Sequence, residues 1–195
     1  MKKYLLLGYL WVFSTVILFA QTTPPVLTPD SNATVDNPFI VSYVDDATWE
    51  TSIDSIFYNS VKLDAVGVYT VDADANTITF DPSLQAILQT PATADLIIYV
   101  TGYNDATVSQ TIGHGAAAKF TITTQPTSPA TNGAVLATQP VLQLKDQYDN
   151  NCDSDDATQV DASATGNGTW TLGGTLPQTA SNGVVSFSGL TASSN

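Results

Sequence analysis

A loop near residue 150 carries the densest group of oxygen-bearing side chains in the chain. It contains Asp146, Asp149, Asn151, Asp153 and Asp155. Carboxylate and amide oxygens on a loop are the ligands that Ca²⁺ takes in proteins, so these five residues are the candidate calcium site. The spacing from Asp149 to Asp153 resembles the start of a helix-loop-helix calcium loop, but neither the glycine nor the closing glutamate of such a loop is present. A solvated polar turn is the favoured interpretation, and calcium held loosely between domains is the alternative.

Residue types that perform catalysis are present, but their spacing fits no mechanism. His114 is the single histidine and Cys152 the single cysteine, so neither a cysteine-based zinc site nor an intrachain disulfide can form. The sequence has no Gly-x-Ser-x-Gly elbow, phosphate-binding glycine loop or nucleotide fingerprint. Asp45 and Asp46 stand at a predicted helix cap, where aspartate has a backbone role. We therefore expect no catalytic residue, no cofactor other than the calcium alternative, and no enzymatic activity.

The charge of the chain is strongly one-sided. Its 195 residues include 18 Asp and Glu against 5 Lys and Arg, a net charge of −13. Nucleic-acid phosphates would repel such a chain, so nucleic-acid binding is excluded. Charged residues make up 12% and hydrophobic residues 43%, which is too apolar for a disordered chain and too interrupted for a membrane bundle. The abundant Thr, Ser, Asn and Asp favour turns and strands over helix interiors.

Residues 1–20 have the features of a secretory signal peptide. Lys2 and Lys3 form a positive start, an apolar stretch follows, and Ala20 is the small residue before the expected cleavage site. An uncleaved anchor is the alternative, although the stretch is at the short end of the roughly 20 residues that span a bilayer. The sequence thus predicts a secreted or cell-surface protein with no membrane span after cleavage.

The next part of the chain reads as a small β domain. Residues 21–37 are rich in proline and threonine and are expected to form an extended lead-in with an edge strand near Leu27. Alternating apolar residues then predict strands, some joined by tight hairpins, at residues 38–44, 56–58, 61–63, 68–71, 77–80, 96–100 and 108–112.

Two short helices interrupt these strands. Trp49, Ile53 and Ile56 have helical spacing, which predicts a helix over residues 45–56 with Trp49 as a core residue rather than a ligand-binding aromatic. Asp81 and Pro82 form a second helix start, a cap followed by proline at the first helical position. The apolar face of that helix would be Leu84, Ile87 and Leu88.

The order of these elements, from the tryptophan helix to the last hairpin, forms a recognisable pattern. The residues that carry it are Trp49, Ile53, Ile56, Tyr58, Asn59, Tyr69, Ile78, Ile97, Val100, Gly102, Tyr103, Asp105, Ala106 and Gln110. Residues 45–112 resemble the bacterial surface module called the haemoglobin-interacting domain, with Ser60 where that family has glycine. The resemblance implies a domain over residues 38–113 and a captured protein, haemoglobin being the family's named ligand. Tyr58, Tyr69 and Tyr103 are the candidate ligand-binding residues, provided that they are exposed together on one face.

A second all-β unit is expected over residues 119–195, after a linker of small residues at 114–118. Asn182-Gly183 between β-rich runs is the strongest short hairpin signal in the chain. The segments at 125–126, 136–140, 146–150, 168–174 and 182–190 resemble a bacterial immunoglobulin-like repeat, with Asp149 in place of a common glycine. Such repeats have further strands after the last of these segments, so we expect this unit to be truncated and to have an unpaired edge.

Together these features predict an all-β chain with two short helices in its first domain. The expected architecture is two small β-sandwich-like modules in tandem, the second incomplete. The predicted function is that of a non-catalytic adhesive or structural stalk in a larger multidomain protein, with protein or glycan partners at the cell surface. Two alternatives stay open: a module that captures a haemoglobin-type protein ligand, or an accessory region of an extracellular enzyme.

Overall fold

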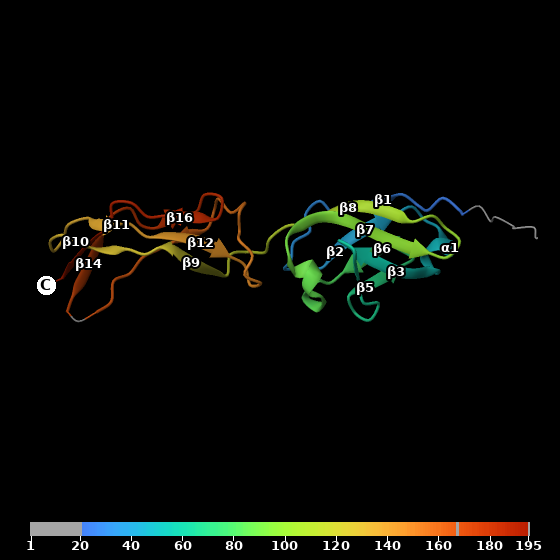
Figure 1. Cartoon of the computed structure of the whole chain (residues 1–195), viewed down its shortest axis with the longest axis horizontal. Coiled ribbons are helices and arrows are strands. Elements are labelled where there is room, and N and C mark those ends of the chain that lie inside the picture. The colour runs from blue at the N-terminus through green and yellow to red at the C-terminus, as the bar shows by residue number, and fades with distance from the viewer. Residues whose placement is uncertain (1–20, 167, 195) are drawn as a thin grey trace, which may run out of the picture.

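The computed structural model describes residues 21–166 and 168–194, so the predicted signal peptide lies outside the described residues. The predicted all-β class is confirmed, and the apolar residues form two separate clusters. We call the elements from β1 to β8 the first domain and those from β9 to β17 the second domain. The two domains lie end to end along the long axis of the molecule (Figure 1). Within the described residues, no helix has the length and apolar character needed to cross a bilayer.

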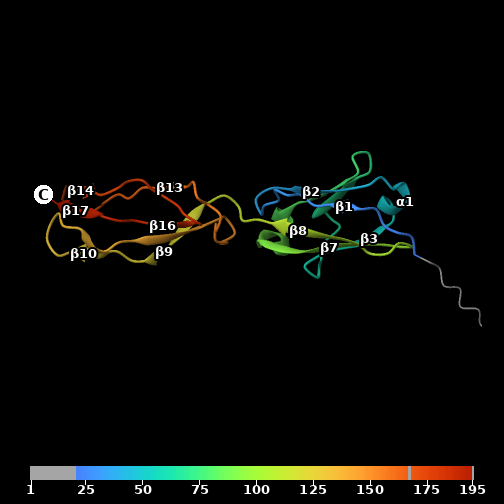
Figure 2. The ribbon, with the colours of Figure 1, turned by 90° about the horizontal axis from the view of Figure 1, so that it is seen from above.

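The first domain consists of two four-stranded antiparallel sheets packed face to face (Figure 2). One sheet has the order β1 (Leu27–Thr28), β2 (Phe39–Tyr43), β6 (Thr77–Phe80) and β5 (Tyr69–Asp72). The other has the order β4 (Val61–Lys62), β3 (Ile53–Tyr58), β7 (Ala92–Val100) and β8 (Ala106–Ile112). Strand β7 includes the strand predicted at residues 96–100, and it is central because it pairs with both β3 and β8.

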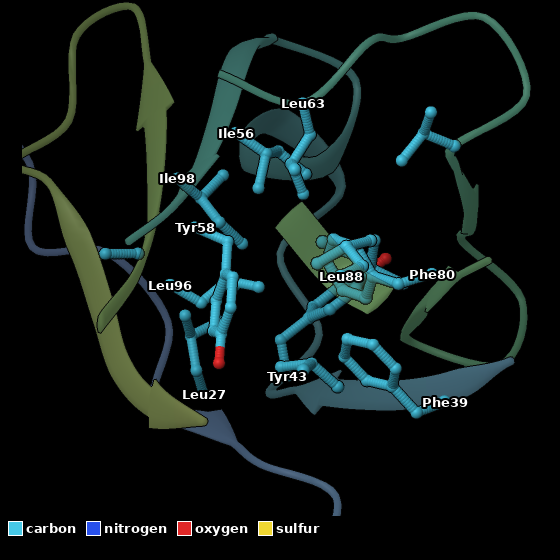
Figure 3. Packing of buried hydrophobic residues seen from close by; sticks show 14 of the residues in the cluster. Leu27, Phe39, Tyr43, Ile56, Tyr58, Leu63, Phe80, Leu88, Leu96 and Ile98 are labelled. Atoms are coloured by element: carbon cyan, nitrogen blue, oxygen red, sulfur yellow. The ribbon is translucent and has the colours of Figure 1, made fainter. Parts of the chain in front are cut away.

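Alternation along the strands builds the core between these sheets. Every second residue of β2 is buried, which places Phe39 against Phe80 with stacked rings 5.1 Å apart. The opposite sheet contributes Ile56, Tyr58, Leu96 and Ile98, and Leu88 fills the space between the two layers (Figure 3). The core is therefore a packed sandwich interior, as the two-residue period predicts.

The predicted first helix is wrong in length. The structure has only α1 (Ala47–Glu50), capped by the Asp46 carboxylate, which accepts hydrogen bonds from the backbone amides of Thr48 and Trp49. Trp49 is fully buried, as predicted, but Ile56 belongs to strand β3. The segment from Ile53 to Tyr58 pairs with β7, with one irregularity between Ile53 and Ser55, and this non-local pairing overrides the helical spacing.

The second predicted helix is also replaced, by two 3₁₀ turns named η1 (Pro82–Leu84) and η2 (Ala86–Gln89). Asp81 caps η1 and Pro82 opens it, as predicted, but only Leu88 of the expected apolar face is buried. The predicted hairpin between β3 and β4 is confirmed. Its turn residues Asn59 and Ser60 have φ values of 49° and 64°, so Ser60 adopts a conformation that glycine accepts more readily.

The second domain is built from smaller sheets. A three-stranded sheet has the order β16 (Val184–Ser186), β12 (Val141–Lys145) and β9 (Lys119–Thr124). Three two-stranded ribbons accompany it: β10 (Thr127–Pro129) with β11 (Leu136–Thr138), β13 (Gln159–Val160) with β15 (Gln178–Thr179), and β14 (Trp170–Gly173) with β17 (Thr191–Ser194). Strand β17 follows the last segment of the predicted repeat and pairs with β14.

The Asn182-Gly183 turn forms, with both residues at positive φ, but the predicted hairpin does not. Strand β15 before the turn pairs with β13, whereas β16 after it pairs with β12. A single bridge between Ser181 and Val184 closes the turn. The turn chemistry was therefore read correctly, and the partners of the flanking strands were not.

Candidate functional site

The three candidate tyrosines do not form an exposed cluster. Tyr58 is 0% exposed, and its hydroxyl donates to the backbone carbonyls of Ala92 at 2.9 Å and Gln110 at 3.3 Å (Figure 3). Burial raises the pKa of Tyr58 above its ordinary value. The residue therefore ties strands of one sheet together from inside the core, and this burial weakens the prediction that it contacts a ligand.

Tyr103 and Tyr69 also have structural partners. The Tyr103 hydroxyl donates to the Asp46 carboxylate at 3.0 Å, so the tip of the β7–β8 hairpin is bound to the cap of α1. Tyr103 is buried, and Tyr69 is half-buried with its ring 6.2 Å from that of Phe80. Burial raises the pKa of both, and the Asp46 hydrogen bond adds to the effect at Tyr103. Tyr103 is therefore held inside the domain, and Tyr69 is partly covered.

A different aromatic pair lies on the outer face of the β4-β3-β7-β8 sheet. Because Ile56, Tyr58, Leu96 and Ile98 point into the core, their neighbours Phe57, Ile97 and Tyr99 point outward. The Phe57 and Tyr99 rings meet edge to face, with centroids 5.3 Å apart, and Phe57 is the register partner of Ile97. We call these three residues the outer patch.

Polar residues border the outer patch. A shallow hollow beside it is lined by Ile97 and by hydroxyl, amide and carboxylate side chains from the β3–β4 turn, β7 and β8, namely Asn59, Ser60, Thr93, Asp95 and Ser109. An apolar centre with a polar border is the usual anatomy of a protein-binding surface. The outer face of the opposite sheet instead presents Ile40, Thr77 and Thr79. Sequence reasoning missed the outer patch because it offered Tyr58 as the ligand-binding residue of this strand, whereas Tyr58 points into the core and its neighbour Phe57 points outward.

The acidic loop is organised by one buried carboxylate. Asp146 is 0% exposed and accepts hydrogen bonds from the backbone amides of Gly115 at 3.0 Å, Tyr148 at 2.9 Å and Asn150 at 3.0 Å. The Asn150 side-chain amide donates to the same carboxylate at 2.9 Å. Burial alone would raise the pKa of Asp146, but the hydrogen bonds from Gly115, Asn150 and Tyr148 outweigh it and hold the pKa below its ordinary value.

The other predicted calcium ligands bind separate partners. Asp149 forms an ion pair with Lys119 at 2.8 Å, and the Asn151 side-chain oxygen accepts from Lys145 at 2.9 Å. Asp155 accepts from the backbone amide and hydroxyl of Thr158, and these bonds hold its pKa below the ordinary value. Asp153 is exposed.

Among residues 21–166 and 168–194, no three His, Cys, Asp or Glu side chains are grouped as metal ligands would be. The loop carboxylates that have partners accept hydrogen bonds from backbone amides of the protein or form an ion pair with one of its lysines. Calcium binding at this loop stays a prediction.

His114 and Cys152 also lie near this loop. The His114 Nε2 atom is 2.6 Å from the Ser154 hydroxyl, and the Cys152 thiol is buried and faces the Gly115 carbonyl. Burial, with the nearby carboxylates of Asp146 and Asp155, raises the pKa of Cys152 to about 11. A thiol with so high a pKa is almost entirely protonated at neutral pH and is a poor nucleophile.

Comparison with solved structures finds weak similarity to several multidomain proteins. A tri-modular GH5 endo-β-1,4-glucanase from Bacillus licheniformis is 14% identical with a TM-score of 0.34; the match covers 63% of this chain and 24% of the glucanase. A titin I9–I11 tandem is 7% identical with a TM-score of 0.28, over 89% of this chain and 64% of that one. Protocadherin gamma B2 domains 3–6 are 16% identical with a TM-score of 0.29, over 87% and 39%. This chain thus spans about a quarter of the length of the glucanase.

Comparison by sequence gives a sharper result for the first domain. A search of the curated proteins finds no match. The family model described as "Heme-binding protein Shr-like, Hb-interacting domain" matches residues 27–113, from strand β1 to the end of β8. The immunoglobulin-like character of the second domain stays a prediction. The resemblance of the first domain is confirmed, because the model of a haemoglobin-interacting domain matches residues 27–113.

Proposed function

We propose that the first domain is a non-catalytic module that captures a protein ligand, and that the chain acts at the cell surface or outside the cell. The observation that carries this proposal is the match of residues 27–113 to a family described as a haemoglobin-interacting domain. The predicted signal peptide supports export. The dispersal of the acidic side chains and the raised pKa of Cys152 favour binding over catalysis.

The outer patch is the surface that suits capture best. Phe57 and Tyr99 are rigid aromatic side chains on a central strand pair, so holding them against a partner costs little conformational entropy. The strands beneath them are the core-forming strands of the domain, which keeps the patch preformed. Polar side chains around the patch supply hydrogen bonds and a solvated border.

Haemoglobin binding to residues 21–195, measured by surface plasmon resonance, tests both parts of the proposal. We expect specific binding by the unmodified protein and a loss of roughly tenfold or more in affinity for Phe57→Thr or Tyr99→Thr, because each removes an anchor. Threonine suits a strand, so both variants should keep the fold. Ile40→Thr is the matched control, because Ile40 is 47% exposed on the opposite sheet and should leave binding unchanged.

Two results would count against the proposal in different ways. Absence of haemoglobin binding by the unmodified protein would reject haemoglobin as the ligand. Binding that is insensitive to Phe57→Thr and Tyr99→Thr but weakened by Ile40→Thr would move the capture surface to the other sheet.

The second candidate function is a structural spacer. The end-to-end arrangement of the two domains favours it, because such an arrangement extends the reach of whatever it carries (Figures 1 and 2). This candidate predicts that no protein ligand binds the outer patch and that replacing Phe57 changes only stability. The same resonance measurement therefore separates the two candidates.

A further inference from the structure

We infer that the turn formed by residues 145–151 of the second domain is a docking element that locks the two domains in one fixed orientation. Residues 114–118 then act as part of a closed joint rather than as a free linker. This turn belongs to the acidic loop that the sequence offers as a calcium site, and the inferred role is mechanical. The inference does not depend on the identity of any captured ligand.

Two carboxylates, one from each domain, accept hydrogen bonds from consecutive backbone amides of the connecting segment. Asp146 of the second domain accepts from the Gly115 amide at 3.0 Å, and Asp36 of the first domain accepts from the Ala116 amide at 2.6 Å. Gly115 is itself buried. The buried Gly115 amide would carry a desolvation penalty if it lost its acceptor, so Asp146 holds the segment at Gly115, while Asp36 adds an exposed hydrogen bond at Ala116.

Asp36 also binds the docking turn directly. Its second carboxylate oxygen accepts from the Gln147 side-chain amide at 3.0 Å. A Cβ atom added to Gly115 would collide with the Asp36 carboxylate, so glycine is the residue that lets the connecting segment approach it. Asp36 therefore contacts both the connecting segment and the second domain.

The other side of the docking turn reaches the end of η2. The Asn150 side-chain amide donates to the Gln89 carbonyl at 2.8 Å while its backbone amide is held by Asp146. Tyr148, between these two polar contacts, packs against the hydrophobic core of the first domain. One turn thus supplies two polar contacts and one apolar contact to the first domain, at three separate points.

Three contacts with different parts of the first domain resist rotation as well as separation. A single hydrogen bond across a junction would leave the domains free to twist about it. The domains instead touch at Asp36, at Gln89 and at the first-domain core, so a rotation between them has to disturb more than one contact. The orientation of the outer patch relative to the second domain is therefore set by the joint.

Residual dipolar couplings of residues 21–195, which hold every element described, test this joint. If the domains are locked, backbone N–H couplings of both domains fit one alignment tensor of equal magnitude. The double variant Asp36→Ala/Gln147→Ala removes the hydrogen bond from the Ala116 amide to Asp36 and the contact between Asp36 and Gln147. In that variant we expect two different tensors, with core chemical shifts unchanged in both domains.

Gln178→Ala is the matched control, because the Gln178 side chain donates only to the nearby Thr175 carbonyl. It should keep the shared tensor. Separate tensors in the unmodified protein would overturn the inference. A double variant that keeps one shared tensor would overturn it too, because the contacts assigned to the joint would then not set the orientation.

Discussion

The two domains hold their folds by different means. The first domain buries large side chains, including Trp49, Tyr58, Phe39 and Phe80, between two four-stranded sheets. The second domain has a smaller core, whose members are Leu142, Leu144, Cys152, Ala180, Val185, Phe187 and Leu190. Since apolar burial contributes roughly in proportion to area, the first domain has the larger hydrophobic stabilisation.

Strand β9 illustrates the difference. It is an edge strand, and all its residues except Thr124 are exposed, with Phe120 53% exposed. In the first domain, every second residue of β2 is buried instead. The second domain therefore depends more on its turns, where Asp146 and Asp155 bind backbone amides and Asn182 and Gly183 take positive φ.

The largest expected effect is the loss of a buried tryptophan from the first domain. Trp49→Ala should cost the first domain about 3–5 kcal/mol of unfolding free energy, because the ring is fully buried against Tyr43. Trp170→Ala in the second domain removes a side chain that is 39% exposed and should cost much less. Urea unfolding followed through the methyl NMR signals of each domain measures both changes.

If Trp170→Ala proved as damaging as Trp49→Ala, the second domain would rely on its aromatic side chains as the first does. The contrast between a core-held and a turn-held domain would then be wrong.

The next effect concerns pH, and the two domains should respond at opposite ends of the scale. The pKa values of Asp146 and Asp155 are held below their ordinary value in the folded state. Their contribution to stability is therefore complete above the ordinary value and is lost as pH falls through it towards the lower folded pKa. Acid should destabilise the second domain first.

The buried tyrosines of the first domain should make its stability fall at high pH instead of at low pH. Burial, with a hydrogen bond to Glu50, raises the pKa of Tyr43, and burial raises that of Tyr58. The folded state thus favours the neutral phenols, so their contribution is complete below the ordinary pKa and is lost as pH rises through the folded value. Alkali should destabilise the first domain first.

Methyl NMR of each domain across a pH titration at a fixed urea concentration measures which domain unfolds first in acid and which unfolds first in alkali. Asp146→Asn removes the titrating carboxylate, and we expect it to lower second-domain stability at neutral pH by about 2 kcal/mol. It should also flatten the acid response. Asp149→Asn is the control, because its carboxylate is largely exposed in its ion pair with Lys119. An acid response equally steep in Asp146→Asn would show that another carboxylate carries it, and Asp155 is the first candidate because its pKa is also lowered.

Local patterns predicted much of the first domain. The alternation from Phe39 to Tyr43, the Asn59-Ser60 turn and the Asp46 and Asp81 caps all depend on neighbouring residues, and all are present. The helix over residues 45–56 failed because Trp49, Ile53 and Ile56 have helical spacing by coincidence. Only the pairing of β3 with β7, far along the chain, decides that Ile53 and Ile56 are in a strand.

The sites were less predictable because they depend on which way a side chain faces. Phe57 and Tyr58 are neighbours, yet one lies on the outer patch and the other in the core. The contacts between the domains could not be predicted for a second reason. Asp36 and Gln147 are 111 positions apart, and no local sequence pattern marks them as partners. Composition identified the loop around Asp146 as unusually acidic, but it did not show which groups the carboxylates bind.

The smallest expected effect compares one glycine from each domain. Gly102 turns the β7–β8 hairpin at φ 89° with open space around it, so Gly102→Ala should cost the first domain about 1 kcal/mol from backbone strain alone. Gly183, at φ 72°, lies against the Cys152 backbone, and an added Cβ would collide with its carbonyl. Gly183→Ala should therefore cost the second domain roughly 2 kcal/mol, the same strain plus a displaced turn. Domain-resolved urea midpoints measure both, and equal losses would mean that the second domain tolerates rearrangement of its turns and is not held by them.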